Sequence, residues 1–305
     1  MTDSSETVAS LLPHRAVLAL AGADTESFLQ GLVSNDVQKL TAEHALYAAL
    51  LTPQGKFLHE LIMVRRGDAV LVDCEAARRA DLQRRLTVYR LRAKVTIAPA
   101  DDLVVAVAFG PGVAETFGLA PVAGTTKVLD SGVAVFVDPR LAELGLRLIG
   151  PREAVVAALA GAGLTLSEGG EAYDRHRLLL GVPDGSRDIA VDRGFLLENN
   201  FEELNGVSFT KGCYVGQELT ARTKHRANIR KRLYTVHFDP AAEPPAPDTP
   251  ILLGGKEVGA MRSAVAGIGL AVLRLDDLKE REGDAHVFTA GELVVEPVRP
   301  SFLAG

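Results

Sequence analysis

Short apolar runs and amphipathic stretches follow one another along most of the chain. Residues 76–89 place Leu82 and Leu86 on one face and their arginines largely on the other, which is the pattern of a helix that covers a sheet. Runs typical of strands occur at residues 103–109, 133–137 and 146–149. Because strands and helices do not alternate regularly, the pattern predicts an α+β fold and not a parallel α/β fold.

Two local signals predict element boundaries in the first 60 residues of the chain. Pro53 and Gly55 predict a type I turn that joins residues 47–51 to residues 57–64 as a β-hairpin. Asp24 has the short acceptor side chain that caps a helix N-terminus, so we expect a short helix to begin after it.

A proline-rich linker precedes the C-terminal part of the chain. Residues 239–250 contain five prolines, which interrupt both helices and sheet ladders. A strand-like run lies before the linker at 233–238, and short segments rich in valine and glycine follow it at 256–263, 268–275 and 293–298. That spacing predicts a small C-terminal β-barrel.

Composition indicates an intracellular globular protein. The chain has 305 residues, 47% of them hydrophobic, and a formal net charge of −6, which gives room for two or three domains and argues against non-specific nucleic-acid binding. No apolar run reaches transmembrane length, so no membrane role is expected. The acidic residues 1–6 fit neither a secretory signal nor an arginine-rich transit peptide. Two distant cysteines make no disulfide framework, and we therefore expect a cytoplasmic location.

The strongest chemical signal is the run KGCYVGQE at residues 211–218. Gly212 is expected to allow a tight turn, and a helix is expected to begin at Tyr214, which places Cys213 at or near a helix N-terminus. There, unpaired N–H groups and nearby cations would lower the pKa of the thiol. The alternative is a buried cysteine with no chemical role, which is the interpretation that a strand-like apolar run favours for Cys74.

The cysteine count limits the metal chemistry. An iron–sulfur cluster normally takes four cysteine ligands, and Cys213 is the one plausible ligand in this chain. Any cluster bound here must therefore be completed by another protein or by a small thiol. A cysteine–histidine hydrolase would need a base, and His225, the nearest histidine in sequence, lies about three turns away if the helix continues that far.

Cations gather directly after this motif, at Arg222, Lys224, Arg226, Arg230, Lys231 and Arg232. Such a run is often only solvated surface. The alternative is an electropositive rim that binds an acidic partner or the carboxylates of a folate tail, to which arginine offers a bidentate contact. Its position beside the cysteine motif favours the rim.

Residues 205–223, NGVSFTKGCYVGQELTART, resemble the signature of the YgfZ family, which are folate-linked iron–sulfur cluster assembly factors related to the glycine-cleavage T-protein. The following stretch, Ile229–Leu233, is most similar to the branch that acts late in mitochondrial [4Fe-4S] maturation. Further matches are Phe28-Leu-Gln-Gly with Asn35-Asp-Val, Leu51-Thr-Pro-Gln-Gly-Lys, Tyr89-Arg-Leu-Arg with Val95, Asp138-Pro-Arg, and Gly181-Val-Pro-Asp-Gly. The resemblance therefore covers nearly the whole chain.

The resemblance implies a T-protein (GcvT)-like fold, with two interlocked α+β lobes around a central cavity and a C-terminal β-barrel. It places the lobes at residues 1–97 and 98–232 and the barrel at residues 233–305. It also implies a factor that builds or repairs [4Fe-4S] clusters with an A-type iron–sulfur carrier protein, with Cys213 as the shared cluster ligand or reactive thiol. The neighbours expected to shape the site are Lys211, Gly212, Tyr214, Gly216, Gln217 and Glu218, with Gly216 allowing close helix packing. The residues assigned to partner binding are Lys224, Arg226, Arg230 and Arg232.

Tetrahydrofolate is the cofactor that the resemblance implies, and here the chain departs from the family pattern. T-protein-like members grip the pterin ring with a glutamate in an Arg-x-Glu-Ala-Gly segment, and Leu179 stands at that place. Glu198 and Arg222 are the remaining candidates for folate binding. The acidic pair for aminomethyl transfer is also absent, because His59 and Glu60 stand there and strand alternation puts them on opposite faces.

Three functions stay open on this basis: an iron–sulfur cluster assembly factor, a folate-dependent aminomethyltransferase and a non-catalytic interaction protein. The first is favoured, because the strongest local signal centres on a thiol and the expected folate carboxylate is missing. Whether the protein is an enzyme is left open, with an assembly factor preferred over a turnover enzyme.

Overall fold

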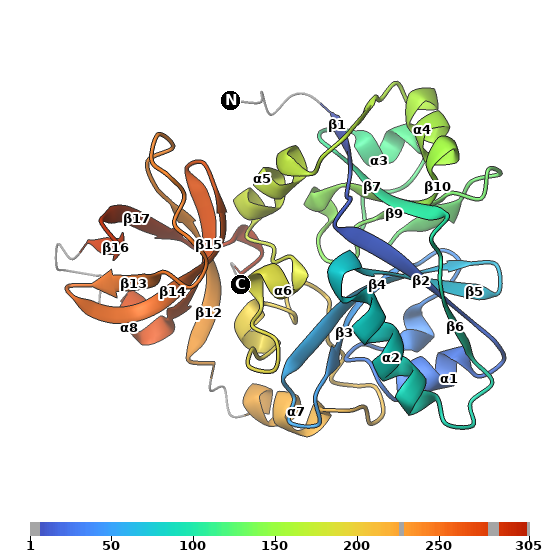
Figure 1. The fold of residues 1–305 in the computed structure, drawn as a ribbon, viewed down its shortest axis with the longest axis horizontal. Helices are drawn as coiled ribbons and strands as arrows, with labels where there is room; N and C mark the ends of the chain where they lie inside the picture. Colours follow the sequence, from blue (N-terminus) through green and yellow to red (C-terminus); the bar gives the residue numbers. More distant parts are fainter. Residues whose placement is uncertain (1–6, 226–228, 280–286, 304–305) are drawn as a thin grey trace. The chain divides into compact units, whose positions relative to one another are not determined.

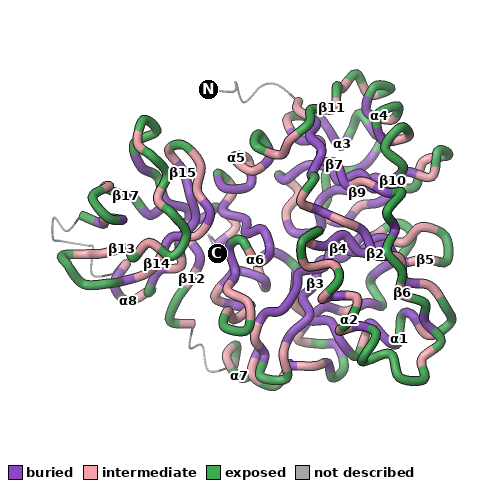
Figure 2. The backbone as a smooth tube through the Cα atoms, in the orientation of Figure 1, coloured by how far each residue is buried: buried purple, intermediate pink, exposed green. Residues whose placement is uncertain are grey.

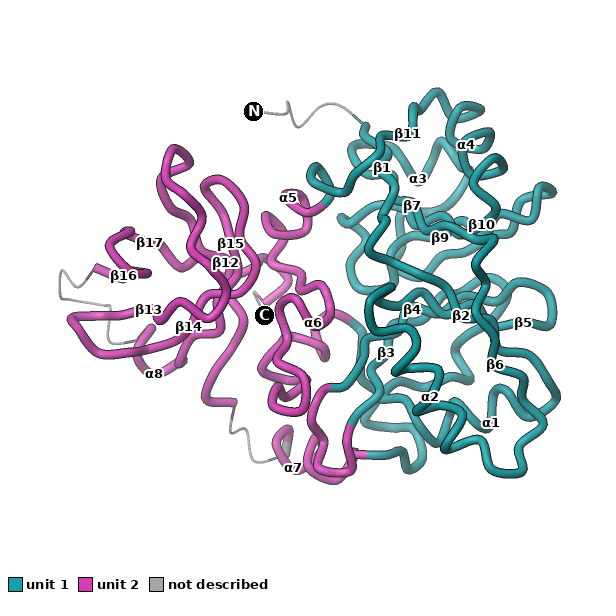
Figure 3. The backbone as a smooth tube through the Cα atoms, in the orientation of Figure 1, with its two compact units in different colours: residues 1–51, 58–173, 205–215 teal, residues 52–57, 174–204, 216–305 magenta. Residues whose placement is uncertain are grey.

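The computed structural model describes residues 7–225, 229–279 and 287–303. The chain divides into two compact units, shown in separate colours in Figure 3. The first comprises residues 1–51, 58–173 and 205–215, and the second comprises residues 52–57, 174–204 and 216–305.

The elements are labelled in Figure 1. The strands are β1 (Val8–Leu11), β2 (Arg15–Ala21), β3 (Leu46–Leu51), β4 (Phe57–Arg66), β5 (Ala69–Glu75), β6 (Thr96–Pro99), β7 (Leu103–Phe109), β8 (Thr126–Val128), β9 (Ala134–Val137), β10 (Leu146–Pro151), β11 (Leu166–Ser167), β12 (Lys231–His237), β13 (Pro250–Leu253), β14 (Lys256–Val265), β15 (Ile268–Arg274), β16 (Phe288–Ala290) and β17 (Leu293–Val298). The α-helices are α1 (Thr25–Gln30), α2 (Arg79–Arg90), α3 (Val113–Thr116), α4 (Arg152–Gly161), α5 (Glu171–Leu180), α6 (Gly185–Asp188), α7 (Gln217–His225) and α8 (Leu275–Lys279). Short 3-10 turns are η1 (Val37–Lys39), η2 (Ala76–Arg78), η3 (Ala142–Leu144), η4 (Leu197–Asn199) and η5 (Ser301–Leu303).

The first unit holds two sheets. One has the strand order β11-β1-β7-β10-β9-β8, and the other has the order β3-β4-β5-β2-β6. All six residues of β3 and the first eight of β4 are buried, so these strands are covered on both faces, as Figure 2 shows. Burial on both faces explains why apolar residues do not alternate with polar ones along β3, and it means that His59 and Glu60 of β4 are buried polar residues.

The predicted elements of this unit are largely present. The strands β7, β9 and β10 coincide with the three predicted runs, and β3 and β4 are neighbours, as the predicted hairpin requires. Helix α2 buries Leu82 and Leu86, and it contacts β2 and β6. The capping role of Asp24 was wrong, because its side chain makes no cap bond to α1 and accepts instead from the Lys94 backbone N–H at 2.7 Å.

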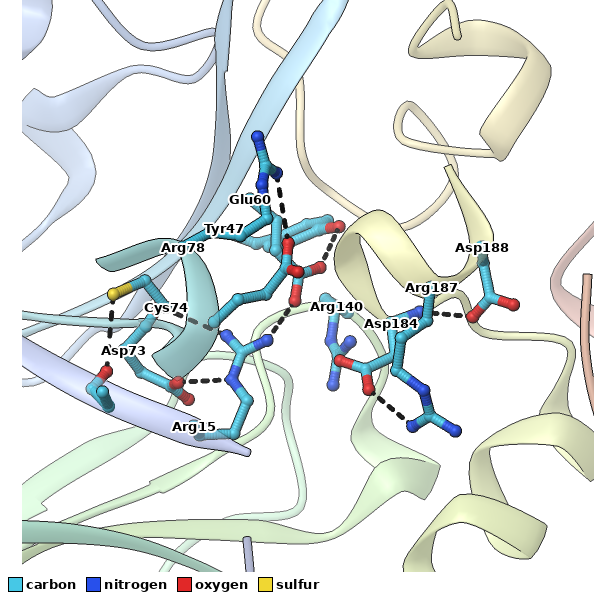
Figure 4. Close-up of polar contacts among 12 residues, drawn as sticks. Arg15, Tyr47, Glu60, Asp73, Cys74, Arg78, Arg140, Asp184, Arg187 and Asp188 are labelled. Carbon is cyan, nitrogen blue, oxygen red and sulfur yellow. Dashed lines mark hydrogen bonds and ion pairs between the residues drawn. The ribbon is translucent and has the colours of Figure 1, made fainter. Parts of the chain in front are cut away.

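A chain of buried ion pairs joins the two sheets of the first unit. Arg15 on β2 donates to Asp73 on β5 at 2.6 Å and also pairs with Glu60 on β4, as Figure 4 shows. The other carboxylate oxygen of Asp73 pairs with Arg147, which belongs to β10 of the second sheet. Arg147 in turn donates to Asp138 at 2.8 Å.

Asp138 is the last carboxylate in this chain of ion pairs, and it is bound by two arginines. Arg140 donates to both of its carboxylate oxygens, at 2.9 Å and 2.8 Å, and Tyr173 lies 3.0 Å from the same guanidinium. The side chains of the three arginines and three carboxylates are at most 2% exposed. Equal numbers of each charge let the cluster stay buried, because every ion has an opposite partner.

The second unit contains the C-terminal barrel. Its strands close in the order β12-β15-β14-β13-β16-β17, around a core that includes Val236, Ile251, Met261 and Phe288. The predicted barrel is therefore confirmed. A second buried ion pair lies in this unit, where Arg177 on α5 donates to Asp188 of α6 at 2.6 Å.

Among the described residues, no helix is long and apolar enough to cross a membrane.

Replacing Asp138 by asparagine is expected to lower the free energy of unfolding by about 3–5 kcal/mol, because it leaves buried arginine charge uncompensated. Burial alone would raise the pKa of Asp138, but Arg140 and Arg147 outweigh it and hold this pKa well below its usual range. The stabilisation is therefore present above the unfolded pKa of about 4 and is lost as the pH falls below it. Urea unfolding of wild type and Asp138→Asn at several pH values measures the difference.

The matched control is Glu26→Gln, which removes a half-exposed partner of Arg65. We expect it to cost less than about 1 kcal/mol. An equally small cost for Asp138→Asn, or a cost that does not shrink in acid, would contradict the assigned role of the buried cluster.

Candidate functional site

Residues 205–215, called the cysteine segment below, lie against residues 31–36 within the first unit. The backbone N–H of Ser208 donates to Ser34 O at 3.0 Å, and the Ser34 hydroxyl donates to Gly206 O at 2.6 Å. The side-chain amide of Asn35 donates to Asn205 O at 2.7 Å. These contacts bridge parts of the chain about 170 residues apart, so the cysteine segment has a fixed seat although it belongs to no helix or strand.

Lys211 makes the central hydrogen bonds that hold the cysteine segment against residues 31–36. Its side chain is buried, and Nζ donates to Val33 O at 2.8 Å and to Asn35 O at 2.7 Å. The ammonium also lies 5.0 Å from the centre of the Tyr214 ring. Burial lowers the pKa of Lys211 to about 8, against the opposing attraction of Asp36. The ammonium is therefore used to hold the segment and faces inward.

Cys213 is exposed, although Lys211 and Tyr214 on either side of it are buried. Helix α7 begins only at Gln217, so the helix predicted from Tyr214 was placed too early. The reason is Gly216, whose φ of 84° is left-handed and incompatible with a right-handed helix. The helix-dipole argument for the thiol therefore does not apply.

The two glycines of the motif differ in their surroundings. Gly212 is exposed, and a Cβ built on it would meet nothing within 4 Å apart from its chain neighbours, so space does not require a glycine there. Gly216 is buried and supplies the left-handed turn before α7, and its expected role in close helix packing stays a prediction. In α7 itself, Gln217 is half-buried and Glu218 is exposed in the first turn.

The other cysteine is unsuited to ligand binding. Cys74 on β5 is 1% exposed and donates to Ala16 O at 3.5 Å. Burial raises the pKa of its thiol to about 12, so it stays protonated. Within the described ranges, no group of three or more histidine, cysteine, aspartate or glutamate side chains could hold a metal ion.

The residues at the place of the aminomethyl-transfer acids are engaged in structure. Glu60 is buried and accepts from Arg15 and from the Tyr47 hydroxyl. His59 lies 2.9 Å from Asp81, and its pKa is lowered to about 4 by burial and by Arg78. The carboxylate is thus neutralised by an arginine and the imidazole is uncharged at neutral pH.

Glu198 borders a polar cavity of about 260 Å³ in the second unit. The cavity is lined by Asp188, Ala190, Arg193, Gly194, Glu198, Asn199, Lys231, Asp248, Arg262 and Val272. Burial raises the pKa of Glu198, against the opposing effect of Lys231 and Lys56. Leu179, at the family's folate position, is a leucine on α5 that is 51% exposed, and Arg222 is exposed on α7 outside this lining set.

The cationic stretch is partly neutralised by the chain's own acids. Lys224 pairs with Glu202, and Arg232 pairs with Glu203 at 2.8 Å. Arg222 and Arg230 are exposed, while Arg226 lies outside the described residues. The assignment of this stretch to partner binding stays a prediction.

Sequence reasoning did not identify the seat of the cysteine segment. Ser34 and Asn35 are buried polar residues near the end of a short apolar stretch; a family motif marked Asn35, and nothing marked Ser34. The buried ions Asp73 and Arg147 left a clearer signal, because each is a charged residue that directly follows or interrupts a run of apolar strand residues.

Comparison with known proteins gives three findings. Residues 230–304 match the family described as CAF17, C-terminal beta-barrel domain. The human protein "Iron-sulfur cluster assembly factor IBA57, mitochondrial" is 35% identical over 302 residues, covering 90% of this chain and 79% of the human one, and its mouse counterpart is 32% identical over 306 residues, covering 93% and 81%. The crystal structure of glycine cleavage system aminomethyltransferase T from Bartonella henselae superposes with a TM-score of 0.75 at 13% identity, covering 97% of this chain and 85% of that one.

The structural match confirms the predicted α+β fold of the T-protein type with a C-terminal barrel; at 13% identity it shows the fold alone. The cytoplasmic location was wrong, because the relatives are named as mitochondrial proteins and point to the mitochondrion. Unpaired cysteines indicate a reducing compartment, and that sign does not separate the two locations.

Lys211→Met is expected to lower the free energy of unfolding by about 1–3 kcal/mol, because two buried carbonyls lose their donor. Lys211 has a pKa of about 8 in the folded protein and 10.5 as a free side chain. The unfolded state therefore binds more protons between these values, and stability rises with pH across that window. Denaturant unfolding at pH 7 to 11 should show this rise in wild type and a flatter curve in Lys211→Met.

Lys39→Met, at an exposed position, is the matched control and should change stability by less than about 0.5 kcal/mol. Identical pH curves for wild type and Lys211→Met would refute the buried ammonium.

Proposed function

The chain belongs to the IBA57 family of iron–sulfur cluster assembly factors, and on that premise we propose that Cys213 is the residue through which it handles the cluster. The observation that carries the proposal is the contrast between its two thiols. Cys213 is exposed on a segment held by buried hydrogen bonds, whereas Cys74 is buried with its pKa raised to about 12.

Having a single available thiol limits how the protein can bind a cluster. The cluster is the protein's cargo and not a resident cofactor. A [4Fe-4S] cluster normally takes four cysteine ligands, so Cys213 supplies one and a partner supplies the others. Ligation requires the thiolate, and the proton of Cys213 leaves to solvent, to which the side chain is exposed. The cluster is therefore shared in a complex and released when the partner or client takes the remaining position.

An A-type iron–sulfur carrier protein is the partner that we propose. Gly212, next to the thiol, is exposed, and a Cβ there would meet no described atom within 4 Å apart from its two chain neighbours. Arg222 is an exposed cation that offers a contact for an acidic partner surface. Lys224 is paired with Glu202, and Arg232 is paired with Glu203.

A folate-dependent aminomethyltransferase is not favoured. The pterin site of the T-protein does not fit this chain, because Leu179 offers no acceptor and half of its side chain faces solvent. Glu60 and His59 are bound into structural contacts. No step through tetrahydrofolate follows from these residues, and a folate role for Glu198 or Arg222 stays a prediction.

Anaerobic mixing with a cluster-loaded A-type carrier tests the role of Cys213. Wild type should form a heterocomplex that carries the cluster absorption through size-exclusion chromatography, and Cys213→Ser should lose the absorption in the complex. Cys74→Ala is the matched cysteine control and should behave as wild type. Retention of the cluster by a Cys213→Ser complex would show that this thiol is not a ligand.

Titration of tetrahydrofolate checks the prediction for Glu198. If the 260 Å³ cavity holds the ligand, Glu198→Gln should weaken binding by about tenfold at neutral pH, because a charged acceptor for the ligand's N–H groups is lost. Leu179→Ala serves as the control on α5. Equal affinities of wild type and Glu198→Gln would place any folate elsewhere.

A further inference from the structure

The end of α2 and the turn that follows it expose three apolar side chains. Val88 is 66% exposed, Tyr89 is 40% exposed and Leu91 is 87% exposed. Leu82 and Leu86 on the same helix are fully buried, so the apolar face of α2 is already used by the core. Large apolar side chains grouped on a surface mark interaction sites more often than single ones do.

Leu91 also has a backbone conformation that does not suit leucine. Ala93 N donates to Arg90 O at 2.8 Å, which closes a β-turn with Leu91 at its second position. The φ of 45° and ψ of −108° at Leu91 approach the type II′ turn, in which this position favours glycine. A residue with a Cβ is strained there.

Comparison with the other left-handed residues makes Leu91 exceptional. The other described non-glycine residues with positive φ are Asp192, Asn200, Asn205 and Asp248. Aspartate and asparagine tolerate this region, whereas leucine does not. Neither packing nor backbone preference therefore accounts for Leu91, because its side chain is exposed and glycine would fit the turn better.

The charged residues in the sequence around this turn are all positive. Residues 82–100 contain five arginines and lysines and no aspartate or glutamate, in a chain with net charge −6. Asp81 pairs with Arg84 and Arg85, and the carboxylate of Asp24 accepts a hydrogen bond from the backbone N–H of Lys94 at 2.7 Å.

The cationic side chains at the turn itself form no ion pair with another described residue. Arg90 donates to Val95 O at 3.4 Å. Arg92 and Lys94 are exposed, and neither side chain has an ion pair or hydrogen bond with another described residue. An apolar anchor thus stands between free cations.

We propose that the surface formed by Val88, Tyr89, Leu91, Arg92 and Lys94, called the basic turn, docks an acidic protein segment. Apolar side chains of that segment pack against Leu91, and Arg92 and Lys94 contact its carboxylates. Exposed arginine and tyrosine around an apolar anchor are the residue types that carry most binding energy at protein interfaces. A membrane surface is less suitable, because α2 buries its apolar face and leaves no long amphipathic face for the bilayer. The inference does not depend on the cluster-binding role of Cys213.

The test uses a short fluorescein-labelled peptide in which leucines alternate with pairs of glutamates, with fluorescence anisotropy as the readout. Wild type should bind it, more weakly as salt is raised. Leu91→Gly should weaken binding by about tenfold or more and leave the midpoint of thermal unfolding unchanged or higher, because the strained turn relaxes. Leu91→Ala should lose binding to a similar extent without the gain in midpoint, and Arg92→Glu with Lys94→Glu should abolish binding.

The controls separate this surface from other sites. Arg274→Glu, at an exposed position on the barrel, and Cys213→Ser should bind the peptide as wild type does. No binding by wild type, or equal binding by Leu91→Gly, overturns the proposal. Binding to phosphatidylserine vesicles or to a labelled oligonucleotide in place of the peptide overturns it in favour of a lipid or nucleic-acid ligand.

Discussion

The first unit depends on one constraint, which is that three buried arginines and three buried carboxylates must all be paired. Arg15 joins strands of one sheet through Asp73 and Glu60, and Arg147 carries the chain of pairs from Asp73 to Asp138 beside the other sheet. Apolar side chains pack in many registers, whereas these ions have one arrangement in which none is left alone. The network therefore fixes how the two sheets meet, and removing one ion costs far more than the pair contributes.

The same constraint reaches the cysteine segment. Arg140 is held by Asp138, and the backbone carbonyls of Pro139 and Arg140 both lie 3.4 Å from the side-chain amide of Asn205. Asn205 is where the cysteine segment begins, and its own carbonyl accepts from Asn35. The buried ion pairs thereby position Asn205, the first residue of the segment. Lys211 positions the middle of the segment through its two hydrogen bonds. Cys213 is therefore exposed on a backbone that is held in place.

Sequence reasoning found the elements whose signal is local. The apolar face of α2, the strand content of the barrel and the contrast between Cys74 and Cys213 follow from short stretches of residues. It failed where the deciding contact is distant. Nothing within residues 211–218 shows that Lys211 points at Val33, or that Gly216 takes a left-handed turn and delays α7. The prediction of a cytoplasmic location failed for another reason. Unpaired cysteines indicate a reducing compartment, but they do not indicate which organelle it is.

A lone ligand suits a protein that passes a cluster on. Four cysteines in one chain would make the cluster a resident, because leaving would break every iron–sulfur bond to that chain at once. If Cys213 is the single ligand, as proposed, the partner supplies most of the free energy of cluster binding, and one ligand exchange completes release. The protein then contributes the position of the thiol more than binding free energy. Lys211 and residues 31–36 hold the segment that carries the thiol. A partner therefore binds without the entropy cost of first ordering this segment. This explains why so many buried polar contacts support one exposed sulfur.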